Sequence, residues 1–229
     1  MSSEPKGPVG EISGELGAVL FDMDGTVVDT EGLWWAACFE VALHLGSALS
    51  ASDQRTLLGL SIEDAAAHLV RLAEDPLDQD KVEAMVTRAF SVRVEAGVTV
   101  LPGALALLDA LRAEGVPAAL VSASPRQVVD LVLETVGADR FQLSIAADEG
   151  GRNKPAPDPY LTAAKKLGVA PENCVAIEDS PTGVASAQAA GCTVVLSGGA
   201  EAVPEGVARV TTLESVDVPL LRLLASRFQ

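Results

Sequence analysis

The sequence predicts an α/β protein in which helices flank a parallel β-sheet and an all-helical segment interrupts the alternation once. Short apolar segments alternate with amphipathic ones over the second half of the chain. Strands separated by helices of about 10–15 residues are typical of βαβ units. Residues 31–97 contain no convincing strand. Acidic or hydroxyl side chains follow several apolar segments, at the strand ends where open parallel sheets bind ligands.

The first strand is expected at residues 18–23, and the alternation resumes after the turn residues Pro102 and Gly103. Each later strand is a short apolar run, and each later helix has an amphipathic pattern. We therefore assign residues 17–30 and 98–229 to one core. Its further expected elements are a helix at 103–114, a strand at 117–121, a helix at 125–136, a strand at 143–146, a helix at 158–167, a strand at 174–177, a helix at 181–190, a strand at 192–196 and a helix from Thr212 to Phe228.

Three helices are expected inside the interruption. The first begins near residue 30 and runs to about Leu45. Ser61, with an acidic residue three positions later, resembles a capping box and begins a second helix that runs to residue 72. The third covers residues 79–96 and ends at Gly97. Residues 31–97 therefore form a helical insertion between the first strand and the rest of the core.

The composition agrees with a soluble enzyme and argues against some classes of partner. The 229 residues are enough to bury a full core. Acidic side chains number 32 against 16 basic ones, and Lys and Arg form no dense cluster, so nucleic acid and anionic membranes are not expected partners. No apolar run approaches the about 20 residues of a membrane span. With no obvious exposed apolar helix, we expect a monomer.

The termini and the cysteines indicate a cytoplasmic protein. Residues 1–16 lack the apolar region of a signal peptide and are expected to form a flexible leader. Cys38, Cys174 and Cys192 are widely separated and lie among apolar neighbours. We interpret them as reduced, buried thiols rather than as a metal cluster or a catalytic nucleophile.

Two carboxylates follow the first apolar strand. Residues 19–26 read VLFDMDGT, so Asp22 and Asp24 leave the same face of the strand near its tip. At a separation of about 4 Å and an effective dielectric of about 20, two such charges repel by about 4 kcal/mol. A shared proton, a cation or a cationic ligand must compensate. Mg²⁺ suits this site because it takes oxygen ligands together with waters and phosphates; an acidic turn without function is the alternative.

This stretch resembles the first motif of the haloacid dehalogenase superfamily, in which DxDGT marks the phosphohydrolase and phosphomutase branches. Three further motifs of that family follow in the same order. They are the hydroxyl motif at 119–124 (ALVSAS), the lysine motif at 153–158 (NKPAPD) and paired acids at 175–180 (VAIEDS), followed by Gly183. The resemblance covers nearly all of the chain after about residue 17. It implies a Rossmann-like core with residues 31–97 as the small helical cap of the β-phosphoglucomutase-like subgroup.

The resemblance implies a role for each acid of the first motif. Asp22 is the expected nucleophile, whose carboxylate attacks phosphorus and forms an aspartyl-phosphate. Asp24 is expected to protonate the leaving oxygen and then to activate water for the second step. The negative charge of the site acids and a phosphate dianion together exceeds the positive charge of Mg²⁺ and Lys154. This excess favours a protonated Asp24 at the start of the reaction.

The resemblance also implies which groups hold the metal and the phosphate. Mg²⁺ is the expected cofactor. Lys154, Ser122 and the Ala123 N–H are expected to contact the phosphoryl oxygens, because backbone N–H groups at a helix N-terminus suit an anion. The expected metal ligands are one carboxylate oxygen of Asp22, the backbone carbonyl of Asp24, Asp179, and Glu178 directly or through water.

Comparison within the subgroup favours hydrolysis. The mutases carry a His where this chain has Trp34, and a Lys and an Arg where it has Leu58 and Ile62. Those basic residues suit the grip on a second phosphate that a mutase requires. Residues 29–34 (DTEGLW) instead resemble the DSEPLW pattern of hexose- and hexitol-phosphate phosphatases. We expect a phosphatase of a sugar or polyol phosphate, with a sugar phosphomutase of the β-phosphoglucomutase type as the alternative.

Three cap residues are candidates for substrate contact. Trp34 either presents a ring face to a sugar or packs the first cap helix. Arg55 and Ser61 are candidates to face the site. His44 and His68 fall within expected helices and receive no catalytic role.

Two other classes of protein share some of these features. A phosphoreceiver signalling domain also combines an acid pair, Mg²⁺, a hydroxyl and a Lys, but it is about half as long and carries its phosphorylated Asp on a middle strand. A catalytically silent binding protein of the same fold typically loses one of the two acids of the first motif. This chain retains both Asp22 and Asp24, so an enzyme is expected.

Overall fold

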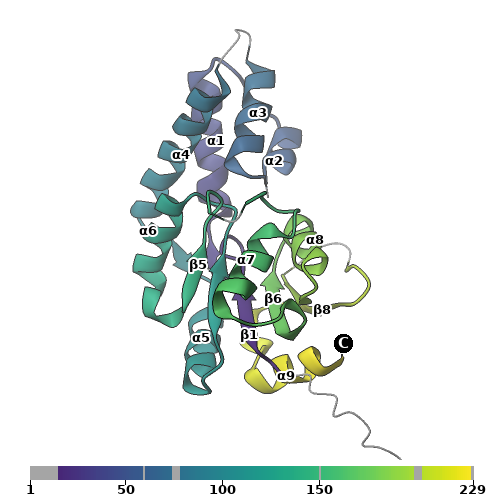
Figure 1. Ribbon diagram of the computed structural model, residues 1–229. Coiled ribbons are helices and arrows are strands. Elements are labelled where there is room, and N and C mark those ends of the chain that lie inside the picture. The colour runs from purple at the N-terminus through teal and green to yellow at the C-terminus, as the bar shows by residue number, and fades with distance from the viewer. Residues whose placement is uncertain (1–14, 59, 74–77, 150, 199–202, 228–229) are drawn as a thin grey trace, which may run out of the picture.

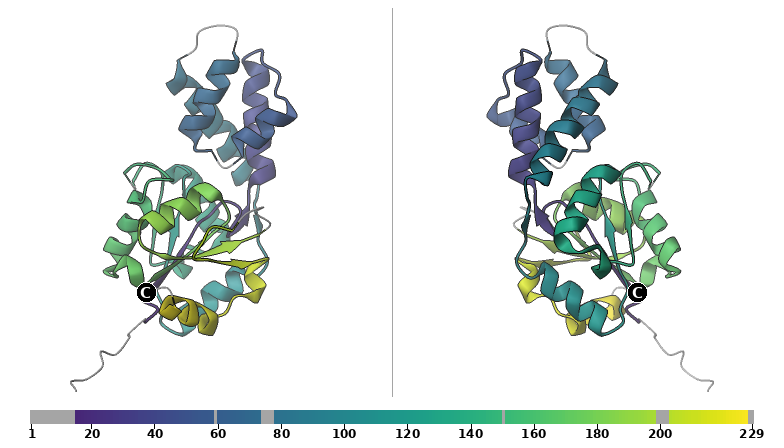
Figure 2. Two further views of the ribbon diagram at one scale, coloured as in Figure 1. Left: turned by 90° about the vertical axis from the view of Figure 1, so that its right-hand side faces the viewer. Right: turned by 90° about the vertical axis from the view of Figure 1, so that its left-hand side faces the viewer.

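The structure is a computed structural model that describes residues 15–58, 60–73, 78–149, 151–198 and 203–227. The expected flexible leader lies almost wholly outside the described residues, as does Phe228 at the expected end of the last helix. Figure 1 shows a sheet-containing core with a bundle of helices standing above it, and Figure 2 shows the bundle from two further sides.

The core contains a sheet of six strands in the order β5-β4-β1-β6-β7-β8, and every neighbouring pair is parallel. The order reverses direction at β1, which places the first strand in the middle of the sheet. This arrangement confirms the predicted fold class. The strands are β1 (Ala18–Phe21), β4 (Ala118–Val121), β5 (Leu143–Ile145), β6 (Cys174–Glu178), β7 (Thr193–Ser197) and β8 (Val207–Val210).

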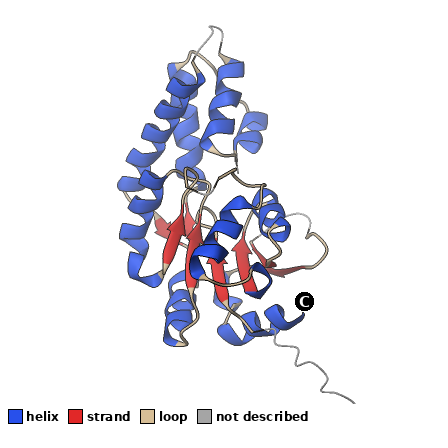
Figure 3. Cartoon of the chain, in the orientation of Figure 1, coloured by secondary structure: helices blue, strands red, loops and turns tan. Residues whose placement is uncertain are grey.

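Helices cover both faces of this sheet, because side chains alternate along each buried strand. Val19 and Phe21 of β1 join an apolar cluster with α5, α6 and α9, whereas Ala18 and Leu20 join another with α7 and α8. Figure 3 shows these helices around the strands. The core helices are α5 (Ala104–Ala113), α6 (Arg126–Val136), α7 (Asp158–Leu167), α8 (Pro181–Ala189) and α9 (Val218–Arg227), with short 3₁₀ turns at Ala138–Arg140, Pro171–Asn173 and Leu213–Ser215.

The cap is an all-helical bundle with its own apolar interior. Its helices are α1 (Glu31–His44), α2 (Ala51–Leu57), α3 (Ile62–Leu72) and α4 (Gln79–Glu95). The α4 helix packs against both α1 and α3. Trp34 and Phe90 meet edge to face inside the bundle, with ring centroids 5.3 Å apart. The division into core and cap at residues 30/31 and 97/98 stays a prediction.

A short antiparallel ribbon joins the chain segments that lead into and out of the cap. It consists of β2 (Val28–Asp29) and β3 (Thr99–Val100), and Val28 pairs with Val100. The Leu101 N–H extends this pairing by donating to the Val27 carbonyl at 2.9 Å. The ribbon was not predicted, because two-residue strands carry no periodic pattern.

Some elements of the structure differ from the elements that the sequence predicts. The predictions missed α2 and β8, and the last helix begins at Val218 rather than at Thr212.

Cys38, Cys174 and Cys192 are free and buried, and burial raises the pKa of each thiol to about 12. Among the described helices, we find none that combines the length and the apolar character needed to cross a membrane.

Candidate active site

A pocket of about 770 Å³ lies between the carboxyl ends of the central strands and the cap. The arrowheads of the strands point toward this region in Figure 3. The core contributes Asp22, Asp24, Ala123, Ser124, Lys154 and Asp179 to its wall. The cap contributes Glu31, Trp34, Arg55, Leu58, Leu60, Ser61, Ile62 and Phe90.

Asp22 directly follows β1 and is only 5% exposed. Its N–H donates to the Ile177 carbonyl at 2.9 Å, which continues the pairing of β1 with β6. Its Oδ1 accepts a hydrogen bond from Lys154 Nζ at 2.6 Å, whereas its Oδ2 is buried without a hydrogen-bond partner. A buried carboxylate oxygen without a partner is costly, so Oδ2 is open to a bound cation or a reacting atom.

Lys154 lies at the centre of the site, with its side chain 5% exposed. Its ammonium group donates to Asp22 Oδ1 and Glu178 Oε1 at 2.6 Å each and to the Val121 carbonyl at 3.0 Å. Burial lowers the pKa of Lys154, but the two carboxylates outweigh it and raise that pKa above its usual value. Lys154 is therefore a fixed positive charge that holds the two acids.

Tyr160 contacts both Glu178 and Lys154, and it was not among the predicted site residues. Its hydroxyl donates to Glu178 Oε1 at 2.5 Å, and its ring centroid lies 5.2 Å from Lys154 Nζ. Tyr160 and Glu178 are both fully buried. The only available signal was its place two residues after the lysine motif, on the helix that this motif precedes.

Asp24 is held by three hydroxyl groups. Thr30 Oγ1 donates to Asp24 Oδ1 at 2.7 Å, and Ser122 and Ser124 donate to Oδ2 at 3.2 and 3.0 Å. Burial raises the pKa of Asp24, and these hydrogen bonds act in the opposite direction. Ser122 also accepts from the Ser124 N–H at 2.9 Å. Ser122 is not among the residues that line the pocket, although the neighbouring Ala123 and Ser124 are.

Glycines allow the acids of the fourth motif to approach the first. Gly25 has φ +83°, and a Cβ at that position would lie 1.9 Å from Asp179 Oδ2. A Cβ at Gly183 would lie 1.9 Å from Glu178 Oε2. Any larger residue at these two positions would displace a carboxylate. Ser180 caps α8 by accepting from the Gly183 N–H at 3.0 Å, which fixes the turn that carries both acids.

Three carboxylates form a cluster that fits a divalent cation. Ligand oxygens of Asp22, Glu178 and Asp179 lie within 4.8 Å of one another. Burial raises the pKa of Asp22 well above its usual value and the pKa of Asp179 to about 7, and the negative charge of Glu178 is the second cause of both shifts. A cation would relieve this repulsion, and the unpartnered Asp22 Oδ2 offers it a hard oxygen ligand. The Asp24 side chain is not in this cluster.

The three cap candidates all line the pocket, but in different ways. Trp34 is buried, and its Nε1 donates to the Leu57 carbonyl at 2.8 Å, so it anchors the end of α2. Ser61 caps α3. Its hydroxyl donates to the Asp64 carboxylate at 2.8 Å and accepts from the Asp64 N–H at 3.1 Å. Arg55 is exposed on α2.

The chain is similar to known proteins over most of its length. Residues 16–191 match a family model described as haloacid dehalogenase-like hydrolase. The chain is 37% identical over 194 residues to Protein CbbY of Rhodobacter capsulatus, covering 80% of this chain and 86% of the relative. It is 36% identical over 189 residues to Hexitol phosphatase A of Escherichia coli (strain K12), covering 77% and 80%. The crystal structure of CbbY from Rhodobacter sphaeroides in complex with phosphate superposes with a TM-score of 0.79 at 26% identity, covering 87% and 96%.

Proposed function

The chain belongs to the haloacid dehalogenase-like hydrolases and is a phosphoric monoester hydrolase, and from this premise we propose that it is a Mg²⁺-dependent phosphatase of sugar or polyol phosphates. The proposal includes an aspartyl-phosphate intermediate on Asp22. The observation that supports it most is the hydrogen bonding of Asp22. Its Oδ1 accepts a hydrogen bond from Lys154, whereas its buried Oδ2 has no hydrogen-bond partner. We also propose that the enzyme acts as a monomer in the cytoplasm.

Asp22 carries out the first step as the nucleophile. One carboxylate oxygen of Asp22 forms a bond to phosphorus while the bond from phosphorus to the ester oxygen breaks. Asp24 gives its proton to the departing oxygen, and burial favours the protonated form that this step requires. Three hydroxyl donors keep the Asp24 carboxyl in one orientation.

The second step releases phosphate. Asp24, now ionised, takes a proton from a water molecule as the water oxygen attacks phosphorus. The bond between phosphorus and Asp22 breaks, and the carboxylate is regenerated. Lys154, together with the backbone N–H groups around Ala123, stabilises the charge on the phosphoryl oxygens in both steps.

The donor set fits Mg²⁺, which Asp22, Asp179, Glu178 and the Asp24 carbonyl would hold. When bound, Mg²⁺ supplies positive charge that lets the nucleophile remain ionised beside the other acids and the substrate phosphate. Without that charge, burial and the neighbouring acids favour a protonated Asp22, which is a poor nucleophile.

The walls of the pocket favour hydrolysis over phosphoryl transfer between sugars. Leu58 and Ile62 line the cap side, at the positions where the sequence lacks the basic residues expected of a mutase. An apolar wall offers no grip for a second phosphate at these two positions.

The proposal is tested by phosphate release from a panel of sugar and polyol phosphates. The wild-type protein is expected to turn over with Mg²⁺, and EDTA or Asp22→Asn is expected to abolish turnover. His44→Gln, on the cap outside the pocket, is the control and should leave the rate unchanged. Isomerisation of a sugar phosphate primed by a bisphosphate, with no release of phosphate, would contradict the hydrolase proposal.

A further inference from the structure

The pocket contains one cationic side chain that no described protein group neutralises. Lys154 and Arg55 are the only Lys or Arg side chains in its described wall. Lys154 is engaged by two carboxylates. Arg55 is exposed on α2 and has no hydrogen bond or ion pair with any residue that the structure describes.

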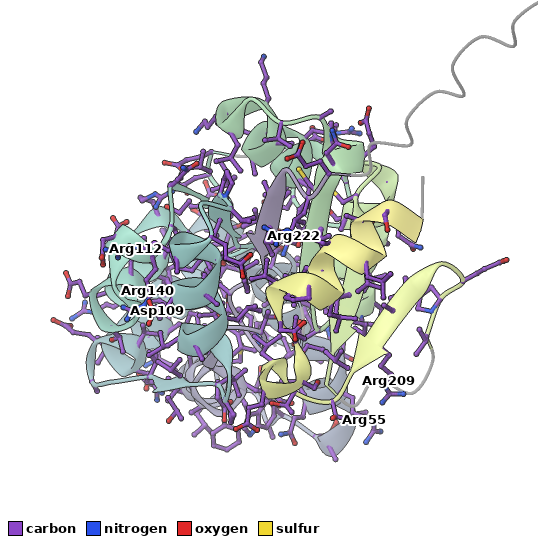
Figure 4. All side chains as sticks on the ribbon, turned by 90° about the horizontal axis from the view of Figure 1, so that it is seen from below. Arg55, Asp109, Arg112, Arg140, Arg209 and Arg222 are labelled. Carbon is purple, nitrogen blue, oxygen red and sulfur yellow. The ribbon has the colours of Figure 1, made fainter. Side chains whose placement is uncertain are left out.

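Most arginines of this acidic protein are paired. Arg93 meets Glu40 at 2.6 Å in the cap, and Arg140 meets Asp109 at 2.9 Å in the core. Figure 4 shows Arg112 and Arg140 gathered with Asp109, whereas Arg55 lies apart from them at the edge of that view. An unpaired guanidinium in the wall of a pocket, in a chain of net charge −16, therefore leaves its donors open to a ligand.

The other hydrogen-bond donors of the cap wall are already occupied. The Trp34 N–H is bound to the Leu57 carbonyl, and the Ser61 hydroxyl is bound to Asp64. The remaining cap residues of the wall are Glu31, whose carboxylate is an acceptor, and the apolar Leu58, Leu60, Ile62 and Phe90. Arg55 is thus the one donor that the described cap wall offers to the organic part of a substrate.

Acceptors for hydroxyl groups lie elsewhere in the wall. Asp29 and Glu31, at the junction of core and cap, are exposed and line the same pocket. Their carboxylates accept hydrogen bonds from hydroxyl groups and repel an anion. The pocket therefore combines a phosphate-facing end, acceptors for hydroxyls and a single guanidinium.

We propose that Arg55 binds a second anionic group of the substrate, so that the preferred substrates are phosphate monoesters of hydroxy acids, sugar acids or related compounds with an additional acidic group. The guanidinium fork matches carboxylate and phosphate oxygens in a bidentate manner. This inference rests on the proposed phosphatase activity and specifies its substrate class.

A matched pair of substrates tests it. Glucitol 6-phosphate and 6-phosphogluconate share a carbon chain and differ in a terminal hydroxymethyl or carboxylate group. The wild-type enzyme is expected to prefer the acid by about tenfold or more in kcat/KM, the range of a charged hydrogen bond. Arg55→Gln should lower kcat/KM about tenfold more for the acid than for the polyol, and Arg55→Lys should retain part of the preference.

A second pair identifies the source of the charge. Preference for fructose 1,6-bisphosphate over fructose 6-phosphate, lost in Arg55→Gln, would assign the subsite to phosphate, and preference within the first pair alone would assign it to carboxylate. Arg88→Gln is the matched control, because Arg88 is an exposed cap arginine outside the pocket. It should alter neither ratio.

Binding separates this inference from the proposed function. In calorimetry with the Asp22→Asn variant, 6-phosphogluconate should bind more tightly than glucitol 6-phosphate, and adding Arg55→Gln should remove the difference. Binding of this kind without turnover in the wild type would refute the phosphatase proposal and support the subsite. Turnover in which Arg55→Gln affects both members of each pair equally would refute the subsite and leave the phosphatase proposal standing.

Discussion

The Tyr160 hydroxyl provides a sensitive test of how the buried acids are held. Tyr160→Phe keeps the ring near Lys154 but removes the hydrogen bond to Glu178 Oε1, which measures 2.5 Å between two fully buried groups. A hydrogen bond to a charged group contributes about 2 kcal/mol. For a chain of this size, about 3 °C of melting temperature corresponds to 1 kcal/mol, so we expect Tyr160→Phe to melt about 6 °C lower.

The variant should also lower kcat, because Glu178 and Lys154 lose a contact that fixes their positions beside Asp22. Ser186→Ala is the matched control. The Ser186 hydroxyl is fully buried and donates to the Ala156 carbonyl at 2.6 Å, and no hydrogen bond in the described residues joins it to Asp22, Asp24, Glu178 or Asp179.

Calorimetric melting of metal-free protein and steady-state kinetics with Mg²⁺ give the two readouts. Ser186→Ala should cost about 1 kcal/mol and leave kcat unchanged. The reasoning is refuted if Tyr160→Phe melts like the wild type, or if it loses stability with no change in kcat or in Mg²⁺ affinity.

Three further predictions concern packing, pH and the cap. Gly183→Ala should destabilise the protein by about 1–3 kcal/mol in thermal melting, because its Cβ would lie 1.9 Å from Glu178 Oε2; Gly32→Ala, whose Cβ meets nothing within 4 Å in α1, should instead stabilise it. The folded-state pKa of Asp179, about 7, exceeds the usual 3.8, so this group stabilises metal-free protein below pH 4 and the contribution is lost as pH rises through 7. Mg²⁺ should therefore raise the melting temperature more at pH 8 than at pH 5, and the reverse order would contradict the metal site. Trp34→Phe should raise KM about tenfold with a smaller effect on kcat, because its N–H no longer anchors α2; steady-state kinetics with an unchanged KM would argue against this role.

The sequence indicated which charged side chains meet in the pocket, but it did not indicate the residues that hold them in place. Asp22, Asp24, Lys154 and Asp179 all occur in motifs that combine a residue type with a position at a strand end or a stiffened loop, and they meet in one pocket. Such positions are visible in sequence because parallel strands bring their carboxyl ends to one edge.

The supporting groups were missed because their roles depend on side-chain direction. Thr30 and Ser124 bind Asp24, and Tyr160 binds Glu178, through contacts between residues distant in sequence or not marked by any repeat. For Ser122 the motif was found, but the sequence does not show that its hydroxyl donates to Asp24. Its contact with a phosphoryl oxygen stays a prediction.

Short elements were missed for a related reason. The α2 segment has seven residues of mostly polar character, and its helix is stabilised by the Ser50–Asp53 capping box. The β8 strand is a half-buried edge strand of four residues. Neither is long enough to show a helical or strand period. Arg55 lies on α2, so the missed helix is also the one that brings a cation into the pocket.

The most direct test of the central claim is chemical capture of the phosphorylated residue. The enzyme is mixed with substrate and Mg²⁺, quenched in acid within the first turnover and reduced with borohydride, which converts an aspartyl-phosphate to homoserine. Peptide mass spectrometry should then find homoserine at position 22. Reduction at another acid, or unmodified Asp22 in an enzyme that releases phosphate, would contradict nucleophilic catalysis by Asp22.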